Sequence, residues 1–297
     1  MNNKNPTVYF AMSCDNKYKY LFYLTVCLES IMKFSNKNIN YLLYLFTNSW
    51  SDEQTKIFNK FTDNYKNLTV QLFDLEKTQI QKTNYINQRY SVSAISRLYL
   101  PVILKNLKKI IYFDCDLFIR VDIKTLYDIE LDKYWVGCVK DYGLISLVER
   151  NSKKYLCNYP HFANLRWNDY VYKILEMKDH RNQFNSGVML INLESFREND
   201  LTKKCVSDYE RIKPVFADQC VLNKHCENNI KYISSEWNVL SSQQVTLGNI
   251  TKIYKKAKII HKPWKHVLIK NEFYDLALKS PFKKIFEKET NEKRKKN

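Results

Sequence analysis

The sequence predicts an α/β fold in which helices flank a mostly parallel sheet. Strand-like and helix-like patterns alternate through the first 115 residues, which is typical of strands joined by crossover helices. One strand pattern, 109–113, is apolar at almost every position, as expected for a strand buried on both faces. With 45% hydrophobic and 14% aromatic residues in 297, the chain can bury a sizeable core, which excludes wholesale disorder.

Each element is predicted from its local pattern. The segment 21–32 carries apolar residues at helical spacing, and Ser51 precedes acidic residues as a helix cap does. The polar region 151–183 shows weak periodicity and predicts a helical insertion or a lid. We expect strands at 8–12, 39–46, 68–73, 109–113 and 186–193, and helices at 21–32, 51–61, 93–104 and from 194 to about 212.

The chain contains no internal repeat and no low-complexity linker, so we expect one main domain, 1–265, and a C-terminal extension, 266–297. In the extension, Phe282, Ile285 and Phe286 fall on one helical face among lysines, and a basic cluster follows at 293–296. Such a segment can lie in a membrane interface next to anionic lipid. A solvated terminal tail explains the same pattern.

Charge and cysteine usage indicate the environment of the protein. The net charge of +17 attracts polyanions, but the lysines are scattered along the chain. The eight cysteines form no C-x-x-C pair, which favours a reducing compartment. A polar N-terminus without a signal peptide and apolar runs too short to cross a bilayer predict a cytoplasmic protein, peripheral at most on the inner face of the membrane.

The strongest chemical signal is Asp114-Cys115-Asp116, which directly follows the apolar strand 109–113. Two carboxylates one residue apart at a strand end project to the same side and repel one another. A hard divalent cation relieves that repulsion and can bind a diphosphate at the same time. Two solvated loop aspartates are the alternative. The sequence has only 4 glycines and neither GxGxxG nor GxxxxGK[ST], so a nucleotide would need phosphate neutralisation of another kind.

The chain resembles glycosyltransferase family 8, the retaining enzymes that include lipooligosaccharide galactosyltransferases, lipopolysaccharide glucosyltransferases and glycogenins. The resemblance covers about residues 7 to 265. Any one of its blocks is weak, but their order along the chain is specific. The blocks are Phe10-Ala11 with Asp15-Asn16, Leu28-Glu29-Ser30, Ser96-Arg97-Leu98-Tyr99-Leu100-Pro101, Tyr112-Phe113-Asp114-Cys115-Asp116, 184–193, Ala217-Asp218-Gln219, Trp237-Asn238 and Ile260-His261-Lys262-Pro263-Trp264.

The resemblance implies a GT-A fold, a UDP-sugar donor and Mn²⁺ or Mg²⁺, held by Asp114, Asp116 and His261. A histidine beside two carboxylates suits manganese better than calcium. Catalysis would fall to Gln219 beneath the anomeric carbon, to Asp218 on the sugar hydroxyls and to Asn185 near the sugar and diphosphate. The donor would be bound by Ala11, Asp15 at the uracil edge, Arg97, Asp114, Cys115, Asp116 and Lys262 at the diphosphate.

Two departures from the family pattern affect these assignments. Relatives place a short glycine-containing loop between the histidine and Lys-Pro-Trp, whereas His261 here directly precedes Lys262, so His266 is an alternative ligand. The first loop is about two residues longer, which affects Asp15. On their own, Arg97 could serve in an ordinary salt bridge, and Asp218 could be a helix cap.

The resemblance and the residues together predict transfer of galactose or glucose from a UDP-sugar to a glycan or glycolipid acceptor. Release of UDP would be the readout of this activity. Because Gln219 is an amide and a poor nucleophile, retention favours attack from the face that the diphosphate leaves, with Asp218 as the candidate for a covalent step. The alternatives are a metal-dependent sugar nucleotidyltransferase, which ordinarily has a glycine-rich first loop, and a nucleic-acid-binding protein, suggested by charge alone. We expect no specific nucleic acid partner.

Overall fold

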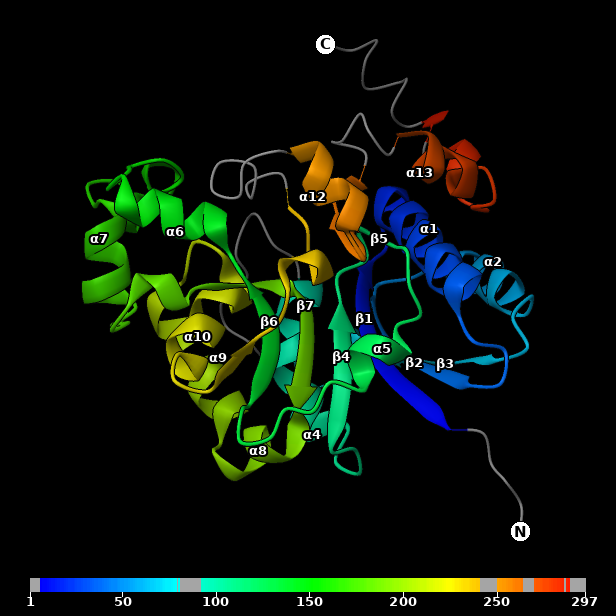
Figure 1. Cartoon of the computed structure of the whole chain (residues 1–297), viewed down its shortest axis with the longest axis horizontal. Helices are drawn as coiled ribbons and strands as arrows, with labels where there is room; N and C mark the ends of the chain where they lie inside the picture. Colours follow the sequence, from blue (N-terminus) through cyan, green and yellow to red (C-terminus); the bar gives the residue numbers. More distant parts are fainter. Residues whose placement is uncertain are drawn as a thin grey trace.

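The structure is a computed structural model that describes residues 6–78, 80, 92–240, 250–263, 270–285 and 287–288. A seven-stranded sheet with the order β3-β2-β1-β4-β7-β6-β8 forms its centre, and β5 and β9 form a second, two-stranded sheet (Figure 1). The strands are β1 (Thr7–Asp15), β2 (Asn40–Asn48), β3 (Leu68–Asp74), β4 (Lys109–Phe113), β5 (Leu117–Ile119), β6 (Val136–Lys140), β7 (Phe184–Asn192), β8 (Ile230–Tyr232) and β9 (Ile259–His261).

The helices cover both faces of the large sheet, as predicted. They are α1 (Tyr18–Phe34), α2 (Asp52–Thr62), α3 (Val92–Ile95), α4 (Leu100–Ile103), α5 (Lys124–Tyr127), α6 (Tyr142–Glu149), α7 (Trp167–Asp169), α8 (Leu193–Glu198), α9 (Leu201–Ile212), α10 (Ala217–Cys226), α12 (Ile250–Lys256) and α13 (Lys270–Ala277). Alternate residues of one strand enter different cores: Phe10 of β1 packs on the α1 side, whereas Ala11 packs on the side of α9 and α10.

The sheet is mostly parallel, as predicted, with one reversed strand. β3, β2, β1 and β4 pair in parallel, while β7 is antiparallel to both β4 and β6. The carboxyl ends of β1, β4 and β6 therefore meet the amino end of β7 at one edge of the sheet. An aspartate stands at each of these three carboxyl ends: Asp15, Asp114 and Asp141. This edge is where ligands bind in open α/β sheets.

The helix expected at 93–104 is instead three short pieces. α3 ends at Ile95, a 3₁₀ turn covers Ser96–Tyr99, and α4 then begins at Leu100. A proline has no N–H to donate and is tolerated in the first turn of a helix, so Pro101 favours a new start at α4 over one continuous helix. The 3₁₀ turn carries Arg97, whose side chain is buried beneath the edge of the sheet.

The insertion 151–183 is helical, as predicted, but only in short turns. They include α7 and a π-helical turn at Tyr170–Ile174. Trp167 and Tyr170 are fully buried there and pack with Val215, which precedes α10. The insertion thus has an apolar cluster of its own, fixed beside the helix that carries Asp218 and Gln219.

The predicted membrane-facing side of the C-terminal extension is wrong at Phe282. Phe282 is 0% exposed, and its ring centroid lies 6.2 Å from that of Tyr18 at the start of α1. Ser280 and Lys279 bind α1 as well, at Thr25 (2.7 Å) and Glu29 (2.7 Å). Figure 1 shows α13 beside α1. Phe286 and the basic cluster 293–296 lie outside the described residues.

A sequence pattern cannot tell whether an apolar helical face is turned toward lipid or toward the rest of the protein. In this structure α1 offers an apolar surface, and Phe282 occupies it. Within the described part of the chain, no helix combines the length and apolar character needed to cross a membrane.

Phe282→Ala should lower the free energy of unfolding by about 3–5 kcal/mol, because it removes a buried aromatic ring and leaves a cavity against α1. Leu278→Ala is the matched control in the same segment: Leu278 is 65% exposed, so its loss should change stability by no more than about 0.5 kcal/mol. Urea unfolding followed by circular dichroism compares the two variants. Equal stabilities would contradict the packing of the C-terminal segment on α1.

Candidate active site

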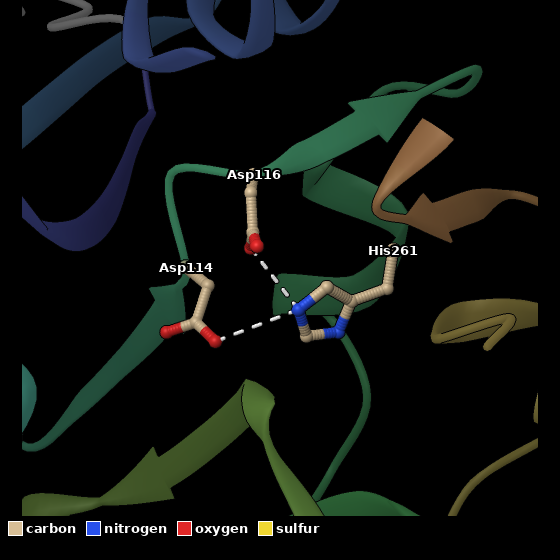
Figure 2. Close-up of side chains that lie close together, drawn as sticks. All are labelled: Asp114, Asp116 and His261. Carbon is tan, nitrogen blue, oxygen red and sulfur yellow. Dashed lines mark ion pairs between the residues drawn. The ribbon is translucent and has the colours of Figure 1, made fainter. Parts of the chain in front are cut away.

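The DxD motif and a distant histidine meet because two short strands pair. Asp114 and Asp116 lie in the turn between β4 and β5, and β5 pairs antiparallel with β9 so that Leu117 is opposite His261. The backbone N–H of Lys262 donates to the carbonyl of Asp116 (2.9 Å) and extends this pairing. Figure 2 shows the two carboxylates and the imidazole converging on one point from these elements.

The three side chains could hold a metal ion. The His261 Nε2 atom lies 3.0 Å from Asp116 Oδ1 and 3.6 Å from Asp114 Oδ2, and one ligand atom from each residue lies within 4.8 Å of the others. Two carboxylates and one imidazole form a donor set for a divalent ion such as Mn²⁺. Among the residues that the structure describes, no other group of three or more such side chains is gathered in this way.

Gly187 of β7 leaves room for this cluster. A Cβ atom at Gly187 would lie 2.4 Å from His261 Cε1 and 2.7 Å from Asp114 Oδ2, far inside van der Waals contact. The carbonyl of Gly187 accepts the backbone N–H of Asp114 (2.8 Å), which fixes β7 against the motif. In the sequence, Gly187 belongs to one of the segments that resemble the family (184–193), but the sequence alone does not explain why a glycine is needed there.

Arg97 neutralises the opposite side of the motif. Its guanidinium is 6% exposed, donates to Asp114 Oδ1 (2.8 Å), lies over the Tyr112 ring (4.2 Å) and has its Nε atom 3.1 Å from Asp218 Oδ2. The Nε hydrogen is directed to the carbonyl of Ala94 (3.0 Å) instead. The Asp218 Oδ2 atom is buried, and because the Nε hydrogen points elsewhere, this oxygen accepts no hydrogen bond within the described part of the chain.

Burial controls the protonation of Asp218. It raises the pKa of this carboxyl to about 6, although the Arg97 charge acts in the opposite direction. Burial would also raise the pKa of Asp116, but its interactions with His261 and Lys262 outweigh burial and hold that pKa below its ordinary value. The two carboxyl groups thus differ: Asp116 is favoured as an anion, whereas Asp218 takes up a proton near pH 6.

A chain of amides lies beside the carboxylates. Gln219 Nε2 donates to Asp141 Oδ2 (3.0 Å), and Asn185 Nδ2 donates to the same oxygen (3.2 Å). Gln219 Oε1 accepts from the backbone N–H of Ser186 (3.1 Å). The structure thus places Gln219, Asn185 and Asp218 near the cluster of Asp114, Asp116 and His261, together with Asp141.

Asp141 and Asn238 were missed as site residues. Asp141 follows β6 just as Asp114 follows β4, so its position after a strand was a usable signal. Asn238 is 0% exposed and lies between Asn185 and His261. Trp237-Asn238 is one of the segments that resemble the family. A single asparagine in a sequence, however, does not show whether it is a turn residue or a buried residue that bonds two others.

The remaining predicted donor-binding residues lie around this edge. Asp15 ends β1 and accepts from Ser93 Oγ (2.7 Å), whereas Ala11 and Cys115 are buried in the apolar cores. Lys262 is exposed, with φ 57°, in the left-handed region that glycine ordinarily occupies. Lys262 thus makes a turn directly after His261 without a glycine. The alternative ligand His266 lies outside the described residues.

Solved structures share this fold. An apo structure of the bifunctional glycosyltransferase WbbM superposes with a TM-score of 0.79 at 19% identity over 97% of this chain and 52% of that one. The galactosyltransferase LgtC, solved in complex with donor and acceptor sugar analogues, superposes with a TM-score of 0.66 at 20% identity over 92% of this chain and 96% of that one.

Sequence comparison agrees with the fold. A Haemophilus influenzae protein named as a glycosyltransferase is 26% identical over 224 residues, which are 74% of this chain and 60% of that protein. The chain spans 51–60% of the length of the curated relatives that it matches. The model of glycosyl transferase family 8 matches residues 10–267, and the chain belongs to this family.

Proposed function

We propose that the protein is a retaining hexosyltransferase that moves galactose or glucose from a UDP-sugar to a glycan acceptor. The observation that supports this most directly is the position of Asp114, Asp116 and His261 beside the buried carboxyl of Asp218. One part of this edge suits a cation and a diphosphate, and the adjoining part offers acceptors to sugar hydroxyls. The LgtC complex with donor and acceptor sugar analogues supports both kinds of substrate.

Asp114, Asp116 and His261 would hold Mn²⁺, or Mg²⁺ in its place. When bound, the ion supplies positive charge to the diphosphate as the leaving group gains negative charge. The exposed Lys262 adjoins Asp116 and would add a second positive charge to the diphosphate. Asp15, at the end of β1, would accept from the uracil edge. Ala11 and Cys115 stay predictions for donor binding through their backbone, since their side chains are buried.

The Asp218 Oδ2 atom has the properties of a sugar-hydroxyl acceptor. It is buried and ion-paired with Arg97 but accepts no hydrogen bond, so a lone pair is left for a sugar hydroxyl. Arg97 holds this carboxyl and Asp114 together, so the sugar-binding and cation-binding groups keep a fixed relation. We expect this contact to contribute to the choice between galactose and glucose, which differ at one hydroxyl.

Retention of configuration is best explained by attack from the face that the diphosphate vacates. The amide oxygen of Gln219 accepts from the Ser186 N–H, and its amide nitrogen donates to Asp141. Gln219 therefore has a positioning role and is a poor nucleophile. Asp218 is ion-paired with Arg97, and this positive charge weakens the carboxylate as a nucleophile. The leaving phosphate oxygen would accept the proton of the acceptor hydroxyl, so proton and leaving-group charge balance without a further base.

From the family resemblance we propose that the acceptor is a glycan or glycolipid at the cytoplasmic face of a membrane, as in lipopolysaccharide or lipooligosaccharide synthesis. With Phe282 buried, any membrane contact of the C-terminal extension depends on the other residues of that segment. Incubation with UDP-glucose or UDP-galactose and MnCl₂ tests the function directly, with released UDP as the readout. UDP release with either donor supports the proposal, whereas release of pyrophosphate from a sugar phosphate and UTP would instead indicate a nucleotidyltransferase.

Asp114→Asn and Asp116→Asn should each lower UDP release at least about 100-fold, because each removes a charged ligand and leaves the side-chain shape. EDTA should abolish activity in the wild type, and MnCl₂ should restore it. Asp132→Asn is the control, since Asp132 is exposed and pairs with Lys231 away from the sheet edge. Full activity in EDTA, or in either motif variant, would overturn the metal assignment.

Asp218 predicts a pH dependence of stability in the metal-free protein. Its pKa is about 6 when folded and about 4 when unfolded, so the folded state binds more protons between these values. This contribution is fully present below pH 4 and is lost as pH rises through 6, on the order of 3 kcal/mol in total. The Asp218→Asn variant lacks this pH-dependent contribution to stability.

Urea unfolding in EDTA at pH 4.5, 5.5 and 7.5 measures the difference. The wild type should lose stability relative to Asp218→Asn as pH rises across this range. A difference that stays constant, or changes in the other direction, would show that Asp218 is an ordinary ionised carboxylate.

A further inference from the structure

We propose that Asn238 is a positioning residue that fixes His261 in the tautomer with a hydrogen on Nδ1 and a lone pair on Nε2. The inference rests on the proposed metal site. Asn238 follows a 3₁₀ turn at Ser235–Trp237, is fully buried, and lies between Asn185 and His261. Figure 2 shows the second ring nitrogen of His261 turned away from the two carboxylates, and this is the Nδ1 atom that faces Asn238 Oδ1 at 3.2 Å.

The polarity of this contact can be traced from a backbone N–H. The Gly187 N–H donates to one side-chain atom of Asn185 at 3.0 Å, and a backbone N–H can only donate, so that atom is the oxygen Oδ1. The other atom of Asn185 is then the amide nitrogen. Its two contacts agree, because both partners are acceptors: Asp141 Oδ2 (3.2 Å) and Gln219 Oε1 (3.2 Å).

The Gln219 orientation is fixed in the same way. The backbone N–H of Ser186 donates to it at 3.1 Å, which makes that atom Oε1 and leaves Nε2 for the carboxylate of Asp141. Two backbone donors and one carboxylate therefore determine both amides, and neither can flip without placing like groups together.

Asn238 passes this polarity to His261. The Asn238 atom that lies 2.9 Å from Asn185 Oδ1 must donate, so it is Nδ2, and the atom facing His261 is the oxygen. An amide oxygen only accepts, so His261 Nδ1 must carry the hydrogen. With the hydrogen held on Nδ1, a metal ion can bind only through Nε2, the atom directed toward Asp116 and Asp114.

The consequence is a site in which all three ligands present electron pairs to one point. The Nε2 atom lies 3.0 and 3.6 Å from the two carboxylate oxygens, so a divalent cation bound between them would receive a lone pair from each of the three side chains. The chain Asp141–Asn185–Asn238–His261 also connects the groups beside the sugar to a metal ligand through hydrogen bonds of one direction.

Nitrogen-15 NMR of the histidine ring in the cadmium-loaded full-length protein tests the tautomer without any activity measurement. With ¹¹³Cd²⁺ as the probe, His261 should show a proton-bearing Nδ1 and a cadmium-coupled Nε2. Cadmium bound through Nδ1, or a proton on Nε2 of the loaded protein, overturns the role of Asn238. Failure of the wild type to bind Cd²⁺ or Mn²⁺ overturns the metal site itself, so the two failures are distinguishable.

Calorimetric titration with Mn²⁺ and Cd²⁺ adds a comparison of variants. Asn238→Ala should weaken the affinity about 10–100-fold, since the acceptor that orients the ring is gone. Asn238→Asp keeps an oxygen facing Nδ1 but places its second oxygen against Asn185 Oδ1, so it should recover only part of that loss. The control Asn192→Ala removes a helix cap at the far end of β7 and should lower stability while it leaves metal affinity unchanged.

Thermal unfolding of each variant separates folding from binding. A folded Asn238→Ala variant with wild-type affinity would overturn the proposal. If Asn238→Ala does not fold, the ring-nitrogen spectrum of the wild type decides the question alone.

Discussion

The repulsion between Asp114 and Asp116 is the constraint on which the rest of the site depends. Two carboxylates one residue apart, at the end of a buried strand, cannot be ionised together without compensation. Arg97 binds Asp114 from below the edge of the sheet, and His261 lies against Asp116 from the second sheet. Gly187 has no side chain, which leaves room for these groups to approach one another. A bound divalent cation would complete this compensation, which makes the same feature costly without a ligand and useful with one.

The fold supplies this arrangement through the direction of its strands. Because β1, β4 and β6 run in parallel, their carboxyl ends and the aspartates that follow them lie at one edge. The reversal of β7 places Asn185 at that edge from the opposite direction. The antiparallel pair β5 and β9 then brings the C-terminal part of the chain to the motif, which is why His261 can act with residues almost 150 positions earlier.

Much of this could be predicted from the sequence, because strongly periodic segments and a carboxylate pair after an apolar strand are local signals. His261 lies beside the DxD motif, as expected, through the pairing of β5 with β9, and Lys262 after it adopts the left-handed backbone. Asn238 could not be predicted, because its role comes from contacts between segments far apart in the chain. Phe282 was assigned to a membrane face because the pattern does not reveal that α1 covers it. Tertiary packing, not local propensity, decided these cases.

The central claim is that one cation bound by Asp114, Asp116 and His261 holds the diphosphate of a nucleotide at the carboxyl edge of the sheet. Anomalous diffraction at the manganese absorption edge, from crystals grown with MnCl₂ and UDP, measures this directly. The account predicts one anomalous peak in contact with all three side chains and with oxygens of the UDP diphosphate. Manganese bound elsewhere, or UDP bound away from these residues, would contradict it.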